Sequence, residues 1–154
     1  MITKEKYRDS ILAHKLSVKI GIQRVIDELH KRAEHHDDDK LEGVVLDSFY
    51  DISGKFEHAK FGSKEYDDIL EKLKPTLDVH YKINDHHPQH NENGISGMNL
   101  MSIVEMLIDW KSASSAYGDN TFEESMLINK KRFEIDEQLY EIMLNTAKSL
   151  GYLD

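Results

Sequence analysis

The amino-acid sequence predicts a single all-α domain over residues 1–154, built as a bundle of five or six helices. Apolar residues recur at spacings of three, four and seven along most of the chain. No segment shows the strict alternation of apolar and polar residues that marks a β-strand. With 154 residues, 39% of them hydrophobic and 32% charged, the chain is long enough to bury a core.

The first helix is expected over residues 4–33, where Ile11, Val18 and neighbouring apolar residues form a stripe. His14 falls on the same stripe. This position predicts an imidazole on a face that is expected to be buried. A lone histidine on such a face is more often a core residue than a ligand.

Two further helices are expected over residues 40–53 and 64–84, on the same kind of spacing. Residues 54–63 between them are expected to form a loop. Pro75 lies inside the second of these helices and is expected to kink or divide it. Residues 85–97, rich in His, Asn, Gly and Pro, are expected to form a loop.

The C-terminal part of the chain predicts a helix over residues 98–116 and a last helix over 121–149. Thr121 and Glu124 match a capping box at the start of the last helix. Its apolar residues recur at sevens, which suits either packing across the bundle or a homodimer seam. They are Met126, Phe133, Tyr140 and Ala147, with Met143 and Leu150 between them.

Composition excludes several classes of function. The absence of cysteine excludes disulfides, thiolate metal sites and a cysteine nucleophile. A net charge of −9 argues against general binding to nucleic acids or anionic membranes. The chain shows neither a signal peptide nor a membrane-spanning run, so a cytoplasmic protein is expected.

The order of histidines and aspartates is the main indication of chemistry. The chain has nine histidines, and together with aspartates they follow the order H…HD…H…HH…D. Such a mixed set of imidazoles and carboxylates can hold one or two transition-metal ions. The candidate ligands are His14, His36, Asp37, His80, His86, His87 and Asp109.

Lys40 follows His36-Asp37 in the pattern HD-x-x-K, which places an ammonium about one helical turn beyond the pair. There it could hold a phosphate oxygen as a point charge. The alternative is that HHDDDK forms a solvated acidic turn in which Asp39 caps a helix.

Asp109 lies in the apolar run VEMLIDW, where a carboxylate is costly to bury unless it is paired or binds a metal. Glu105 lies one turn earlier on the same face, and two neighbouring acids repel each other. A cation or a histidine neighbour would resolve this conflict. Alternatively, both carboxylates point to solvent on an amphipathic helix.

Four histidines occur within the eleven residues from His80 to His90, and packing does not explain them. His80 and Asn84 share a helix face, and His86-His87-Pro88 then turns the chain. The alternative is a histidine-rich surface patch that binds metal adventitiously.

The pattern His14 … His36-Asp37-x-x-Lys40 … Asp109 resembles the HD-domain superfamily of metal-dependent phosphohydrolases. In that superfamily a helical bundle holds metals through H…HD…D, so the resemblance implies an HD-domain-like bundle. His35 also precedes the motif, but His36 stands directly before the aspartate, as the motif requires.

The segment HHPQHNENGISG is similar to the paired-histidine loop of the HD-GYP phosphodiesterases. Ile95-Ser96-Gly97 occupies the place of the GYP tripeptide, and the separation of His80 from His86 is shorter than is usual there. The chain also resembles an uncharacterised family of small phage and bacterial proteins that carry HxxxNxHHPxH and EMxxDW motifs.

The resemblance implies one or two divalent metal ions, of Mn, Fe, Co, Ni or Zn, with Mg also possible. A first metal would be held by His14, His36, Asp37 and Asp109. Asp37 would bridge it to a second metal, held by His80, His86 and His87. Water activated by the metals would attack a phosphoester, with a nucleotide as the expected substrate. The expected catalytic residues are Lys40, Asp37 and Glu105, and Glu105 or His90 would orient ligands.

Two other classes of function are compatible with the same residues. Some HD-domain proteins use a diiron site for oxygen chemistry, with similar ligands. The chain could also be a non-catalytic helical protein in which a metal or another ligand is bound for structure or sequestration. A closed shell of protein ligands would favour such a structural role over catalysis.

Overall fold

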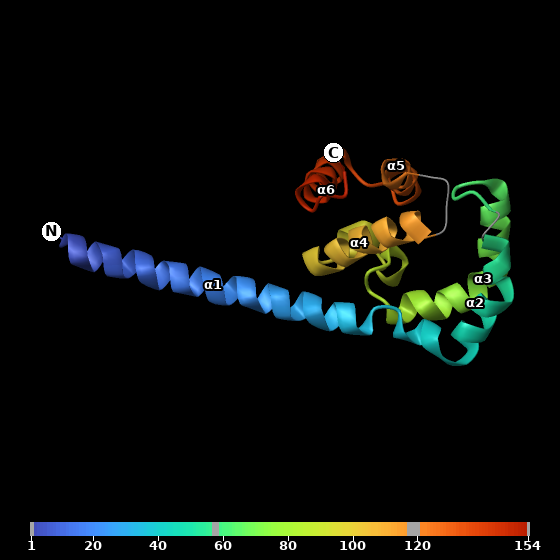
Figure 1. Ribbon diagram of the computed structural model, residues 1–154, viewed down its shortest axis with the longest axis horizontal. Helices are drawn as coiled ribbons and strands as arrows, with labels where there is room; N and C mark the ends of the chain where they lie inside the picture. The colour runs from blue at the N-terminus through green and yellow to red at the C-terminus, as the bar shows by residue number, and fades with distance from the viewer. Residues whose placement is uncertain (1, 57–58, 117–120, 154) are drawn as a thin grey trace. The chain divides into compact units, whose positions relative to one another are not determined.

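The computed structural model describes residues 2–56, 59–116 and 121–153 (Figure 1). These ranges contain six α-helices and no strand, which confirms the predicted all-α class. The chain forms two compact units, Met1–His36 and Asp37–Asp154, and the division of the chain into one domain remains a prediction. No described helix is long and apolar enough to cross a membrane.

The first unit consists of helix α1, Lys4–His35, which is close to the predicted range. Thr3 caps α1 by accepting a hydrogen bond from the backbone N–H of Lys6 at 3.2 Å. None of the residues of α1 is buried, and His14 is exposed together with its apolar stripe. The expectation of a buried face at His14 is therefore wrong for this unit, because α1 has no second helix within its unit to pack against.

The described residues of the second unit form five α-helices and three short 3-10 helices. In chain order they are η1 (Asp38–Leu41), α2 (Gly43–Phe56), α3 (Lys64–Ile83), η2 (Pro88–His90), η3 (Gly94–Gly97), α4 (Leu100–Ala116), α5 (Phe122–Arg132) and α6 (Glu137–Ser149). Part of the loop expected over 54–63 belongs to the end of α2, and residues 57 and 58 lie outside the described ranges.

Helix α3 packs against α2 and forms one of two hydrophobic cores. The spacing of its buried residues Ile69, Leu73 and Leu77 places them on a single face of the helix. Pro75 lies inside α3 without dividing it, so the helix runs unbroken from Lys64 to Ile83. The long unbroken helix carries His80 in its last turn.

The second core lies among α4, α5 and α6. Met106 and Leu107 of α4 are at most 1% exposed, and Trp110 stacks on Phe133 with ring centroids 5.9 Å apart. The other buried members are Phe122, Met126, Ile135, Tyr140, Met143 and Ala147. This core holds in place the helix that carries Glu105 and Asp109.

The single helix predicted over 121–149 is instead two helices, α5 and α6. The predicted capping box is confirmed, because Thr121 and Glu124 make both of its hydrogen bonds. The helical conformation is interrupted after α5, where Glu134 takes a left-handed φ of 51°. Asp136 then caps the start of α6 by accepting a hydrogen bond from the backbone N–H of Leu139 at 2.8 Å. Most of the apolar residues spaced at sevens still pack in the same core, although they lie on two helices.

We expect the substitution Leu107→Ala to destabilise the second unit by about 2–5 kcal/mol, because it leaves a cavity in the second core. Ile108→Ala is the matched control. The Ile108 side chain is 42% exposed, so this substitution should lower the free energy of unfolding by less than about 1 kcal/mol. Urea denaturation of the two variants measures both values. Equal losses would contradict this packing of α4.

Candidate metal centre

Four side chains of the second unit converge at the candidate site. Asp37 immediately precedes η1, His80 lies in the last turn of α3, and His86 and His87 lie in the loop after α3. One ligand atom of each residue lies within 4.8 Å of the others. Such a group can hold a metal ion.

Asp37 has a left-handed backbone conformation, with φ 59° and ψ 24°. This conformation costs a non-glycine residue about 1–2 kcal/mol, although aspartate tolerates it better than most residues. The backbone N–H of Lys40 donates to the Asp37 carbonyl at 2.9 Å, and the Lys40 ammonium lies 2.7 Å from Asp37 Oδ2. These contacts hold the carboxylate so that Oδ1 lies 3.5 Å from the Nε2 atoms of both His80 and His86.

His80 is 1% exposed, and its ring is held by a carboxylate on the far side from Asp37. Its Nδ1 lies 2.7 Å from Asp39 Oδ2, and because a carboxylate can only accept, Nδ1 carries the proton. The Asn84 amide donates to the other Asp39 oxygen at 2.9 Å and to the His80 carbonyl at 3.0 Å. The lone pair of His80 Nε2 therefore faces the cluster.

Sequence reasoning missed this role of Asp39, which it considered only as a helix cap. In the structure Asp39 lies within η1, and no side-chain cap is formed there. The run of three aspartates was the available signal, but it did not indicate which carboxylate meets a histidine.

The His86 ring is oriented in the same way, by a carboxylate from another helix. It is 2% exposed, and its Nδ1 lies 3.2 Å from Glu105 Oε1 of α4. The structure thus supplies a histidine neighbour for Glu105, one of the alternatives that the sequence leaves open. Because Nδ1 faces Glu105, Nε2 is the His86 nitrogen that faces Asp37.

His87 completes the group. Its Nε2 lies 2.8 Å from Nε2 of His80, and its ring packs on those of His86 and Tyr81 with centroids 4.1 and 4.9 Å apart. Burial, together with the neighbouring His86 and His80, lowers the pKa of His87 to about 2. Burial also lowers the pKa of His80. Both imidazoles are therefore neutral at pH 7, the form that binds metals.

Three of the distances among these atoms are close to those between ligands of a small divalent cation. Tetrahedral ligands about 2.0–2.1 Å from a zinc-like ion stand about 3.3 Å apart. The two Asp37–histidine distances are 3.5 Å, and the His80–His87 distance of 2.8 Å requires only a small widening. Three imidazoles and one carboxylate favour Zn, Fe, Co, Ni or Mn over Mg, which prefers oxygen ligands.

The remaining predicted residues are placed as follows. Asp109 is half-buried on α4, with a carboxylate oxygen within 4.8 Å of one from Asp37. His90 is exposed, and its Nδ1 bonds the Tyr81 carbonyl at 3.0 Å. His14 and His36 belong to the first unit, whose position relative to the second is not defined, so their part in the site stays a prediction.

A comparison with known protein families assigns the chain to a family but gives no activity. The profile of a family of unknown function, DUF5662, matches residues 3–150. The chain belongs to the DUF5662 family. No curated protein and no solved structure matches this DUF5662 member. The feature of this DUF5662 protein that points to a function is the candidate metal centre.

We expect His80→Ala to remove stoichiometric binding of Zn²⁺ or Mn²⁺, because it deletes one of four converging ligands. Asp39→Asn should weaken binding by about 10–100-fold, since it removes only the group that orients His80. His90→Asn, which changes an exposed histidine outside the four-residue group, should bind as the unsubstituted protein does. Calorimetric titration of chelator-treated protein measures all three, and equal affinity in the first and last variants would contradict the ligand assignment.

We also expect acid to destabilise the metal-free protein below about pH 6.5. The folded state depresses the pKa of His80 and His87, so the unfolded chain binds protons first as the pH falls. The contribution of the two histidines to the free energy of unfolding is complete above pH 6.5. Below pH 6.5 it falls by at most about 1.4 kcal/mol per pH unit for each histidine. Urea denaturation at pH 7, 6 and 5 should give a shallower pH dependence for His87→Asn than for His90→Asn. The same dependence in both variants would argue against a buried, neutral His87.

Proposed function

We propose that this protein is a metal-dependent phosphohydrolase that acts on a nucleotide or another phosphoester. The observation that carries the proposal is the convergence of Asp37, His80, His86 and His87 beside the ammonium of Lys40. The resemblance of the sequence order to the HD-domain superfamily supports the same reaction class. The acidic overall charge is compatible with an anionic substrate, because bound cations reverse the local sign.

Lys40 is suited to meet a phosphoryl oxygen at this centre. Its Nζ lies 2.7 Å from Asp37 Oδ2 and 5.1 Å from the ring centroid of Phe49, while a third of the side chain stays exposed. The ammonium is thereby held beside the ligand carboxylate yet remains open to an incoming group. A point charge in that place offsets the negative charge that develops on phosphoryl oxygens.

The surrounding carboxylates hold the imidazoles in their binding form. Asp39 and Glu105 face the Nδ1 atoms of His80 and His86, which directs both Nε2 atoms inward. A divalent cation bound there would lower the pKa of a bound water towards about 7 and polarise the phosphoester. By the resemblance to the HD-domain superfamily, we also propose that Asp109 takes part in holding a second ion.

A direct test is turnover by chelator-treated protein reloaded with Mn²⁺, Fe²⁺, Co²⁺, Ni²⁺, Zn²⁺ or Mg²⁺. The substrates are p-nitrophenyl phosphate, bis(p-nitrophenyl) phosphate and a panel of nucleotides. We expect metal-dependent release of the phosphate or alcohol product, and its loss in Asp37→Asn together with the loss of metal. Absence of turnover across the panel, or full turnover by Asp37→Asn, would refute the proposal.

We expect Lys40→Met to lower kcat/KM by about 10²–10³-fold, the range for deleting one charged donor at a developing oxyanion. Because Lys40 also holds the Asp37 carboxylate, the variants are compared at saturating metal, where the site is equally occupied in each. Lys72→Met is the control, since Lys72 is an exposed lysine on α3. If Lys40→Met and Lys72→Met keep the same kcat/KM, Lys40 has no role in the reaction.

A further inference from the structure

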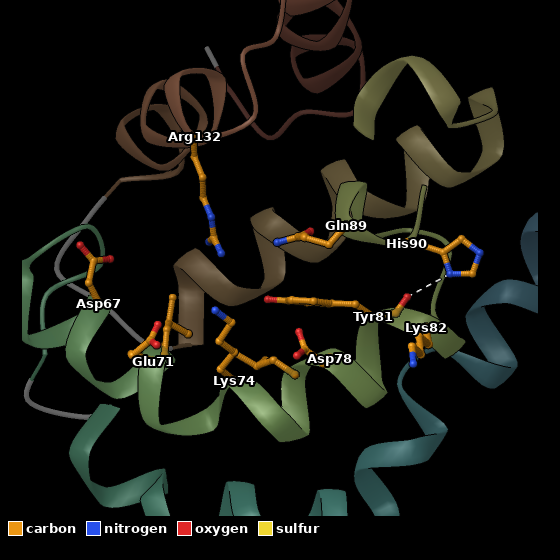
Figure 2. A pocket seen from close by; sticks show the side chains of 11 residues that line it. Asp67, Glu71, Lys74, Asp78, Tyr81, Lys82, Gln89, His90 and Arg132 are labelled. Atoms are coloured by element: carbon orange, nitrogen blue, oxygen red, sulfur yellow. Dashed lines mark hydrogen bonds between the residues drawn. The ribbon is translucent and has the colours of Figure 1, made fainter. Parts of the chain in front are cut away.

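A pocket of about 610 Å³ lies in the second unit, between α3, η2 and α5 (Figure 2). It adjoins the metal centre through Tyr81, whose ring lines the pocket and also packs on His87 at a centroid distance of 4.9 Å. The volume is within the range of about 300–1,000 Å³ that is typical of small-molecule sites. The pocket therefore lies one side chain away from the metal centre.

Hydrogen-bonding groups from three elements enter the pocket. Figure 2 shows Arg132 from α5 pointing towards α3, with the side chains of Gln89 and Lys74 and the hydroxyl of Tyr81 directed into the same space. Leu70 and Leu77 contribute apolar surface to the lining. The pocket thus combines several donors with an apolar wall and an aromatic ring.

Charge distinguishes between an anionic and a neutral occupant. The lining carries three cations and three carboxylates, so it has no net positive charge to attract a phosphate. The carboxylates also accept hydrogen bonds, whereas a phosphate offers few donors for them. The cations are Lys74, Lys82 and Arg132, and the carboxylates are Asp67, Glu71 and Asp78.

We infer that this pocket binds the uncharged, hydrogen-bonding part of the substrate, a group of nucleoside or sugar size, and that it does not bind a second phosphate. Such a group carries hydroxyl or amide donors for Glu71 and Asp78, and acceptors for Arg132 and Gln89. The inference rests on the proposed function, in which the phosphoester is held at the metal centre. Arg132 and Asp78 are then specificity-determining residues.

Equilibrium binding tests this inference apart from catalysis. The full chain, both chelator-treated and loaded with Zn²⁺, is titrated with adenosine, with ribose and with inorganic phosphate, and binding is followed by NMR shifts and calorimetry. We expect adenosine or ribose to bind both forms, and phosphate to bind only the metal-loaded form. Tighter binding of adenosine than of ribose would assign the pocket to a nucleoside, and the reverse to a sugar.

Substitutions locate the binding site. Arg132→Gln and Asp78→Asn should each weaken binding of the neutral probe by about tenfold, which corresponds to the loss of one charge-assisted hydrogen bond of about 1.4 kcal/mol. Lys131→Gln, at the exposed neighbouring position of α5, should change it less than twofold. The inference fails if neither neutral probe binds at millimolar concentration, if all three variants bind alike, or if phosphate binds the metal-free protein through Arg132. Because metal-free protein is used, none of these results depends on phosphohydrolase activity.

Discussion

Two buried imidazoles, those of His80 and His86, each turn Nδ1 towards a carboxylate, and the candidate site depends on this pairing. Burying an imidazole without a polar partner is costly, so Asp39 and Glu105 allow both rings to lie in the interior. The same contacts determine which nitrogen of each ring faces Asp37. They also connect η1, α3 and α4, so the two hydrophobic cores and the ligand set support one another. A change that frees either ring would therefore disturb both packing and binding.

The fold could be predicted where local signals were strong. Thr121 and Glu124 marked the start of α5, and the spacing of Ile69, Leu73 and Leu77 marked α3 to within a residue of its observed end. The break at Glu134 could not be predicted, because the apolar sevenfold pattern continues across it. The exposure of α1 also could not be predicted. An apolar stripe indicates a face that can be buried, but it does not show whether the same unit contains another helix to cover that face.

The site was partly predictable. The dense block of histidines and the HD pair placed Asp37, His80, His86 and His87 among seven candidate ligands, and the structure brings these four together. The sequence could not distinguish Asp39 from its neighbouring aspartates, because only the meeting of η1 with α3 brings that carboxylate to His80. The pocket at Tyr81 was also hidden, since its lining comes from residues of α3, η2 and α5 that carry no shared motif.

The proposal that three imidazoles and the Asp37 carboxylate hold one divalent cation can be tested by crystallography. Its most direct test is an anomalous-difference map from crystals of protein loaded with Zn²⁺, recorded on both sides of the zinc absorption edge. We expect a peak about 2.0–2.1 Å from Nε2 of His80, His86 and His87 and from Oδ1 of Asp37. A map with no peak among these four atoms, or with zinc bound only at exposed histidines such as His90, would contradict it.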